Sequence, residues 1–104
     1  MIKKAVVFGG SGFLGSYVAD ELTRRGFKVA IADIAVPRCR RDGREFELCD
    51  IMNPMRVSEI VAGADVVYNF AGMANLDESL HSAHETMMYN VIGNINVLDA
   101  CATI

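Results

Sequence analysis

The sequence is short of several residue types, and each shortage excludes a class of protein. Among 104 residues there are no tryptophans, two prolines and three cysteines. No apolar run approaches the roughly 18 residues of a transmembrane helix, and glycines interrupt the apolar stretch that follows Lys3 and Lys4, unlike a signal peptide. An odd number of widely spaced cysteines indicates reduced thiols rather than a disulfide framework. These absences predict a cytoplasmic protein without a membrane partner.

Positive charge is missing from the second half of the chain. Residues 57–104 hold no Lys or Arg and six Asp or Glu, a net charge of −6, whereas residues 1–56 hold ten Lys or Arg against seven Asp or Glu, a net charge of +3. A nucleic-acid-binding face needs clustered positive charge, so we expect no nucleic-acid partner. With 52% hydrophobic and 22% charged residues, the composition is that of a globular chain, of one domain at most.

Apolar segments alternate in a way that predicts a β-α-β-β-α-β order followed by a long helix. We expect strands at residues 3–8, 28–32, 45–49 and 64–70, and helices at 13–25, from Pro54 to Gly63, and from 81 to about 102. Nearly continuous apolar strands are typical of parallel sheets covered on both faces. The predicted fold class is α/β, a partial Rossmann-like doubly wound parallel sheet of about four strands in the order 3-2-1-4 with three helices.

The last predicted helix has an unusually wide apolar face. Apolar residues recur there at spacings of three and four, namely Ala83, Met87, Met88, Val91, Ile92, Ile95, Leu98 and Ala102, and Val97, Cys101 and Ile104 widen this face. Such a face is expected to pack on the sheet and on a second partner at once, or to lie in a subunit interface. The pattern therefore favours a homo-oligomer formed through the last helix.

A glycine-rich turn separates the first predicted strand from the first helix. Gly9, Gly12 and Gly15 match a Gly-x-x-Gly-x-x-Gly spacing, and Gly10, Gly12 and Gly15 match Gly-x-Gly-x-x-Gly. Glycine allows positive φ and close approach of backbone N–H groups to phosphate, and the following helix directs its positive end toward the same anion. A Walker-type loop is excluded, because Ser16 follows Gly15 directly, with no lysine between them. The turn predicts a dinucleotide pyrophosphate site.

An acidic residue stands at the distance from this turn that a dinucleotide site requires. Asp33 lies 21 residues beyond Gly12, at the end of the second predicted strand, where a carboxylate can accept hydrogen bonds from ribose hydroxyls. A solvated strand-end acid is the alternative reading. The carboxylate would repel a 2′-phosphate, which favours NAD over NADP, although an arginine cluster in the next loop is suited to NADP, namely Arg38, Arg40, Arg41 and Arg44.

Three motifs in the same order resemble the extended short-chain dehydrogenases/reductases, the group of NAD-dependent epimerases and dehydratases that act on nucleotide sugars. Besides the Gly-Phe-Leu-Gly turn at 12–15, these are Asn69-Phe70-Ala71-Gly72 with the Asp-Glu-Ser stretch at 77–79, and the helix 89–101, which is similar to the family's Asn-Val-x-Gly-Thr-x-Asn-Leu-Leu-Glu-Ala. Asn94 stands where the family usually has threonine, and His84 near where it often has proline.

The resemblance implies a set of cofactor-binding residues and no metal site. Asp50 would accept from the adenine amine and Ile51 would pack on the adenine ring, although Asp50 is also placed to cap the helix near Pro54. Asn90 would help set the geometry of the site, or is a polar residue on a helix flank. The full implied set is Gly9, Gly12, Phe13, Leu14, Gly15, Asp33, Ile34, Asp50, Ile51, Phe70, Ala71, Gly72 and Asn90.

No catalytic residue of the family is expected within these 104 residues. The family's Tyr-x-x-x-Lys lies beyond the last helix, and Tyr17, Tyr68 and Tyr89 have no lysine four residues on. The resemblance therefore implies that residues 1–104 are the N-terminal part of a dinucleotide-binding Rossmann domain, which by itself would turn over no substrate. A nucleotide-sugar substrate would belong to a full-length protein. The alternatives are a non-catalytic dinucleotide-binding sensor or interaction module, and a degenerate domain that binds no nucleotide.

Overall fold

A computed structural model describes residues 2–35, 44–72 and 88–102. It contains four parallel strands, β1 (Lys4–Phe8), β2 (Lys28–Asp33), β3 (Arg44–Leu48) and β4 (Val66–Asn69), in the order β3-β2-β1-β4. The helices are α1 (Phe13–Arg24), α2 (Pro54–Val61) and α5 (Gly93–Ala102), and a π-helical turn, η1 (Met88–Ile92), leads into α5. The predicted fold class and strand order are confirmed, and the strand and helix limits agree with the predictions to within about two residues over the described ranges.

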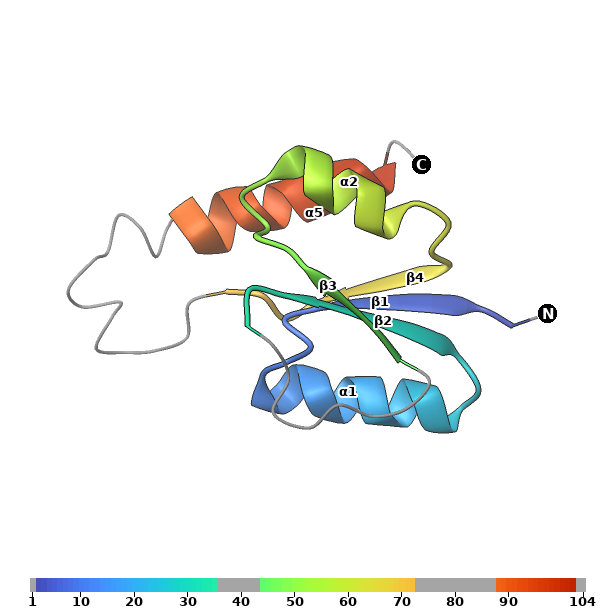
Figure 1. Cartoon of the computed structure of the whole chain (residues 1–104). Coiled ribbons are helices and arrows are strands. Elements are labelled where there is room, and N and C mark those ends of the chain that lie inside the picture. The colour runs from blue at the N-terminus through green and yellow to red at the C-terminus, as the bar shows by residue number, and fades with distance from the viewer. Residues whose placement is uncertain (1, 36–43, 73–87, 103–104) are drawn as a thin grey trace.

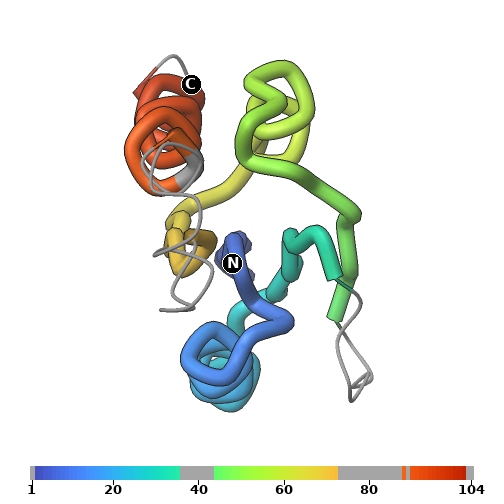
Figure 2. Tube along the Cα trace, turned by 90° about the vertical axis from the view of Figure 1, so that its left-hand side faces the viewer, coloured from blue at the N-terminus to red at the C-terminus, as the bar shows by residue number. Residues whose placement is uncertain are grey.

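The sheet is sandwiched between one helix and two. Helix α1 lies against one face, and α2 and α5 lie side by side against the other (Figures 1 and 2). Successive residues of β1 face opposite layers: Ala5 and Val7 pack with the α1 side, and Val6 and Phe8 with the α2 and α5 side. All four are fully buried, as expected of a central strand with both faces covered.

Local sequence signals explain where the helices begin and end. Asn53 caps α2, since its Oδ1 accepts a hydrogen bond from the backbone N–H of Arg56 at 3.2 Å, and Pro54 occupies the first turn. Gly26 and Gly63 have φ values of 92° and 78° beyond the ends of α1 and α2. Asn53 rather than Asp50 is therefore the cap near Pro54.

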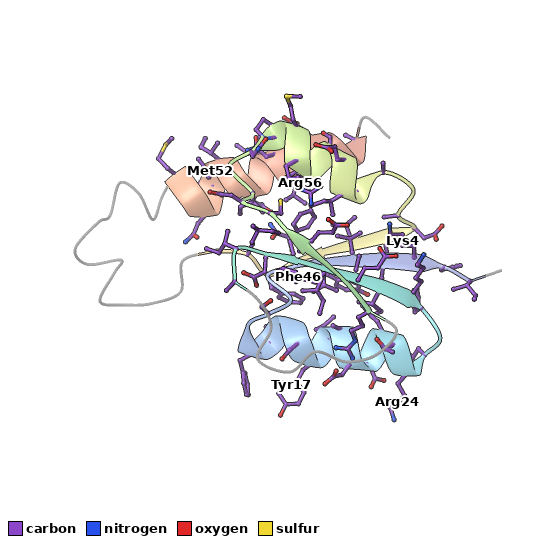
Figure 3. All side chains as sticks on the ribbon, in the orientation of Figure 1. Lys4, Tyr17, Arg24, Phe46, Met52 and Arg56 are labelled. Carbon is purple, nitrogen blue, oxygen red and sulfur yellow. The ribbon has the colours of Figure 1, made fainter. Side chains whose placement is uncertain are left out.

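The buried face of two helices differs from the apolar stripe that the sequence suggests. On α1 the buried residues are Gly15, Ala19 and Leu22, whereas Phe13 and Tyr17 pack edge-to-face with each other and are 82% and 61% exposed; Figure 3 shows Tyr17 directed away from the sheet. Small residues at Gly15 and Ala19 let α1 approach the strands closely, Leu22 packs in the core beside them, and Phe13 and Tyr17 are left outside.

The same reversal holds for α5. Its buried residues are Gly93, Val97 and Ala100, while most of the predicted apolar stripe that falls in the described part is exposed, namely Met88, Val91, Ile92, Ile95 and Leu98. Of the wide apolar face, Val97 thus packs in the core, while the rest of its described residues lie on the outer side. Residues 81–87 of the predicted helix lie outside the described residues. Within the described ranges, no helix is both long and apolar enough to cross a membrane.

Parallel pairing brings the carboxyl ends of all four strands to one edge of the sheet. Phe8 at the end of β1 aligns with Ala32 of β2 on one side and Asn69 of β4 on the other, and Asp33 aligns with Leu48 of β3. The segments that follow these strands therefore emerge beside one another. Ligands of open α/β sheets bind along such an edge, at the point where the strand order reverses.

Candidate functional site

The glycine turn after β1 is packed tightly enough to require glycine at specific positions. Gly9 has φ 75°, and a Cβ there would lie 2.6 Å from the backbone nitrogen of Ala71 and from the carbonyl carbon of Phe70. A Cβ on Gly15 would collide with the carbonyl oxygen of Gly9. At Gly12 the contact would be only an ordinary 3.4 Å to that oxygen, so its outer side is open. The turn thus packs inward through Gly9 and Gly15 and leaves Gly12 available to a ligand.

The two alternative glycine spacings have different roles. A Cβ on Gly10 would lie 2.6 Å from the Ile31 side chain, so Gly10 is needed for packing against β2. Gly9, Gly12 and Gly15 form the turn itself, since the Gly12 N–H donates to the Gly9 carbonyl at 3.2 Å and the Gly9 N–H donates to Ala32 at 2.8 Å. The Gly-x-x-Gly-x-x-Gly spacing is therefore the one that describes the site.

The beginning of α1 suits an anion. Gly12 is the N-cap with extended backbone, no side chain caps the helix, and its first turn holds no acidic residue. The first backbone N–H groups of a helix lack intrahelical partners, and the helix dipole is positive at this end. Phe13 and Leu14 direct their side chains to solvent, so they contribute backbone N–H groups rather than side chains to the site. Phosphate oxygens have the charge and hydrogen-bonding capacity that this end requires.

The Asp33 carboxylate is hydrogen-bonded to the backbone of the glycine turn. Its Oδ2 accepts a hydrogen bond from the Ser11 N–H at 3.0 Å, and its Oδ1 accepts one from the Ala35 N–H at 3.1 Å. Each carboxylate oxygen can accept a second bond, so the group remains available to ribose hydroxyls while its orientation is set by the backbone. Ile34 beside it is exposed and offers an apolar surface next to the carboxylate.

Ser11 has an unsatisfied polar atom next to this carboxylate. Its Oγ is buried and has no hydrogen-bond partner within the described part of the chain. Burying a hydroxyl without a partner is unfavourable by about 1–3 kcal/mol. A ligand that supplied a hydrogen-bonding partner to this hydroxyl would remove that cost. An orphaned hydroxyl, an uncapped helix and an oriented carboxylate together fit a dinucleotide with its pyrophosphate and ribose groups.

Asp50 and Ile51, the two residues expected around adenine, follow β3, but the first is exposed and the second is buried. Asp50 is exposed, and its Oδ1 accepts from the Met52 N–H at 2.9 Å, so a second acceptor position faces solvent. Ile51 is only 1% exposed and packs against Gly93 of α5. The expectation that the Ile51 side chain packs on adenine is therefore wrong, because that side chain belongs to the core.

The residues after β4 lie directly beside the glycine turn. The Phe70 N–H donates to the Phe8 carbonyl at 2.8 Å, which continues the pairing of β4 with β1, and the Phe70 ring packs partly against the α1-side core. Ala71 is next to Gly9. A Cβ on Gly72 would lie 2.9 Å from Oδ1 of Asn90, so η1 brings Asn90 to this loop. The four predicted residues Phe70, Ala71, Gly72 and Asn90 therefore lie together, although Asn90 comes from a distant part of the sequence.

Arg44 is not placed for a 2′-phosphate. Its side chain is 9% exposed, with Nη2 paired to the Asp20 carboxylate and Nε donating to Oγ1 of Thr23 at 3.0 Å, both on α1. Arg44 thus links the edge strand β3 to α1. Because its guanidinium is engaged there, it is not available to bind the 2′-phosphate of NADP. Arg38, Arg40 and Arg41 lie outside the described residues, as do the Asp-Glu-Ser stretch at 77–79, His81 and His84.

The remaining titratable groups near the edge do not form a reactive centre. Burial raises the pKa of the Cys49 thiol; Arg56 opposes this with a smaller lowering effect than that of burial, and the Asp50 and Glu47 carboxylates add smaller increases. The thiol is therefore protonated and unreactive at neutral pH. Among the described residues there is no group of three or more His, Cys, Asp or Glu side chains that could hold a metal ion.

Three polar residues of the site were not among those predicted. Ser11 lies inside the glycine motif, where a hydroxyl between two glycines was the available signal. Asn69 and Asn94 join the end of β4 to α5 through a side-chain hydrogen bond of 2.8 Å. Asn94 stood out in the sequence only as a departure from the usual threonine, and its partner is 25 residues away, so its contact could be identified only in the folded chain.

Comparison with known proteins agrees with this geometry. The model of the NAD dependent epimerase/dehydratase family matches residues 5–104. A UDP-glucose 4-epimerase of Mycoplasma genitalium is 26% identical over 97% of this chain and 32% of its own length. Another, of Klebsiella pneumoniae, is 33% identical over 93% of this chain and 78% of its own length.

The structural comparison leads to the same family. A crystal structure of Thermus thermophilus UDP-glucose 4-epimerase in complex with NAD superimposes with a TM-score of 0.83 and 27% identity, over 94% of this chain and 33% of that protein. The chain spans about a third of the length of that structure and of the Mycoplasma relative. With a family model that matches nearly every residue and the same fold, the chain belongs to the NAD dependent epimerase/dehydratase family.

Proposed function

We propose that residues 1–104 form the N-terminal part of a dinucleotide-binding Rossmann domain that binds NAD, in an oxidoreductase acting on nucleotide sugars. The observation that carries the proposal is the bond from the Ser11 N–H to Oδ2 of Asp33, which joins the turn after β1 to the acid that ends β2. Pyrophosphate and adenosine ribose are adjacent groups of one ligand, and this bond makes their two predicted binding elements a single unit.

The described residues supply a place for each part of NAD. The N–H groups at Gly12, Phe13 and Leu14 would hold the pyrophosphate, and Asp33 the ribose hydroxyls. Ile34 and Asp50 would border the adenine, while Phe70, Ala71, Gly72 and Asn90 would border the nicotinamide side. When bound, NAD supplies a hydride acceptor. Asp33 disfavours a 2′-phosphate by charge repulsion, which supports NAD over NADP.

We further propose that the 104-residue chain binds its cofactor without turnover. No tyrosine in the sequence is followed four residues later by lysine, and residues 57–104 contain no lysine at all. The chain therefore lacks the Tyr-Lys pair that exchanges a proton with the substrate in this family. Binding of a nucleotide-sugar substrate would require a longer protein. A non-catalytic dinucleotide-binding module is the second candidate, favoured by the exposed apolar face of α5. The free cysteines Cys49 and Cys101 support a reducing, cytoplasmic location.

Calorimetric titration with NAD and, separately, NADP tests the cofactor proposal. Saturable binding of NAD that is tighter than that of NADP is the expected result. If a folded sample, judged by a cooperative thermal transition, bound neither nucleotide, either the site would need further elements of a longer protein or the domain would be the degenerate alternative that binds no nucleotide.

Replacing Gly12 by alanine is expected to separate binding from folding. A Cβ there meets nothing closer than the Gly9 carbonyl at 3.4 Å, so the melting temperature should stay within about 3 °C of the original, equivalent to well under 1 kcal/mol. The methyl group would project toward the approaching pyrophosphate, and NAD affinity should fall about tenfold or more, or about 1.4 kcal/mol. Gly26→Ala is the reciprocal control: Gly26 lies beyond the far end of α1 with φ 92°, so alanine there should lower the melting temperature and leave NAD affinity unchanged. Equal NAD affinity in Gly12→Ala and the original chain would contradict this assignment.

We also propose that the chain self-associates through the outer face of α5. Leu98 is 60% exposed there, and Val91 and Ile95 are exposed beside it; a contiguous apolar surface of this kind is typical of an interface. Leu98→Glu should convert a dimer into a monomer in sedimentation velocity. Met55→Glu is the matched control, since Met55 is an exposed apolar residue of α2. A monomeric original chain, or dimers unaffected by Leu98→Glu, would contradict the proposal.

A further inference from the structure

The start of α5 contacts both loops that flank the predicted nucleotide. Nδ2 of Asn96 donates to the Ile51 carbonyl after β3 at 2.9 Å, and Gly93 packs on the Ile51 side chain. On the other side, Oδ1 of Asn94 accepts from Nδ2 of Asn69 at the end of β4, at 2.8 Å. One turn of helix thus connects the expected adenine and nicotinamide sides of the site.

The chemistry of Asn69 determines what Asn94 must provide. The Ala71 N–H can only donate, and it donates to Oδ1 of Asn69 at 3.0 Å. The Asn69 amide therefore directs its NH₂ group toward α5, where only an acceptor can meet it. Asn94 supplies that acceptor through its side-chain oxygen, and the two bonds hold the Asn69 amide in one orientation between α5 and the backbone of Ala71.

Ala71 in turn lies against the most constrained residue of the glycine turn. The Cβ position of Gly9 is 2.6 Å from the Ala71 nitrogen and from the Phe70 carbonyl carbon, so the two backbone segments pack directly on each other, with no room for a side chain between them. Contacts therefore run without a break from Asn94 through Asn69 and Ala71 to Gly9. Packed backbone transmits displacement because interiors have few voids.

We propose that Asn94 is a positioning residue for the dinucleotide: by accepting from Asn69 it fixes the Ala71 backbone against Gly9, and so sets the shape of the pyrophosphate turn from the opposite face of the sheet. This inference rests on the proposed function for the ligand, but the contacts that carry it do not depend on the ligand. It assigns a role to a position where the chain departs from the motif that its helix resembles.

The test uses two substitutions of similar size at one exposed position. Asn94→Leu removes the acceptor, whereas Asn94→Asp keeps it. In the 104-residue chain, NAD affinity measured by calorimetry should fall about threefold to tenfold in Asn94→Leu, the range for one net hydrogen bond, and should stay within about twofold in Asn94→Asp. Amide hydrogen exchange at Ala71, measured by NMR without ligand, should be about threefold to tenfold faster in Asn94→Leu, by the same estimate, and unchanged in Asn94→Asp.

Asn96→Leu distinguishes positioning from a general loosening of α5. It removes the bond to Ile51 and should lower the melting temperature while leaving Ala71 exchange unchanged. Unchanged Ala71 exchange in Asn94→Leu, or equal acceleration in Asn96→Leu, would overturn the inference. If the original chain bound no NAD, the proposed function would fail, and the Ala71 exchange of the Asn94 variants would alone decide the positioning role. If NAD bound equally well to the original chain and to Asn94→Leu, the role in binding would be excluded.

Discussion

Replacing Asp33 by alanine is expected to weaken NAD binding about a hundredfold. A carboxylate that accepts from two ribose hydroxyls makes two charge-assisted hydrogen bonds, each contributing about 1.5–3 kcal/mol, and the lower end of their sum, about 3 kcal/mol, corresponds to slightly more than a hundredfold. The variant also loses the bond from the Ser11 N–H, which orients the glycine turn. Calorimetric titration of Asp33→Ala with NAD measures the effect.

The preference between the two cofactors should change in the same variant. Without the carboxylate, the repulsion of a 2′-phosphate disappears, so the ratio of NAD to NADP affinity should fall toward one. Asp65→Ala is a matched control: Asp65 also accepts from a backbone N–H, that of Lys4 at 2.7 Å, but at the amino end of β1, away from the site. An Asp33→Ala protein that binds NAD as tightly as the Asp65→Ala protein would show that Asp33 is only a strand-end acid.

Replacing Gly9 by alanine is expected to lower the free energy of unfolding by about 2–4 kcal/mol. Positive φ accounts for about 1 kcal/mol of this loss, and overpacking for about 1–3 kcal/mol more. The atoms that a Cβ would meet belong to the backbone of Phe70 and Ala71, which cannot move aside as a flexible side chain would. Urea unfolding followed by circular dichroism gives the value. A domain of this size is stable by about 5–15 kcal/mol, so the loss is a large share of the total.

Gly63→Ala isolates the steric part of this effect. Gly63 has nearly the same φ, 78° against 75°, but nothing lies within 4 Å of its Cβ position. The two substitutions therefore carry a similar conformational cost, and only Gly9→Ala adds a collision. Equal losses of stability in the two variants would mean that the loop after β4 does not pack on the glycine turn, and would also remove the basis for the positioning role of Asn94.

Much of the architecture could be predicted from local pattern. Continuous apolar runs such as Ala5–Phe8 indicate buried parallel strands, and the glycines after α1 and α2 mark the ends of those helices. A glycine turn between a strand and a helix, with Asp33 at the required distance, predicts a dinucleotide site from a single chain segment. These features depend on contacts between near neighbours or on a spacing along the chain, which is why they can be read from sequence.

The buried faces of the helices could be predicted only in part. Hydrophobicity favours Leu22 on α1 and Val97 on α5, and both are buried. It also favours Leu14 and Leu98, which are exposed, whereas the structure buries Gly15 and Ala19 on α1 and Gly93 on α5. Close approach of a helix to a sheet selects small side chains, because a bulky one would hold the two backbones apart. Ile51 is in the core for the same reason, since Gly93 leaves room for it.

The order of the elements, the parallel sheet, the glycine turn and the acid that accompanies it therefore follow from local sequence. Three contacts emerge only from the folded chain: the Ser11 N–H donates to Asp33, Ala71 packs on Gly9, and Asn94 accepts from Asn69. Each of these is a contact between residues more than 20 positions apart, made where parallel strands deliver their carboxyl ends to one edge. Such contacts depend on how the helices and the sheet pack together, and a local sequence pattern does not specify which residues meet across so many positions.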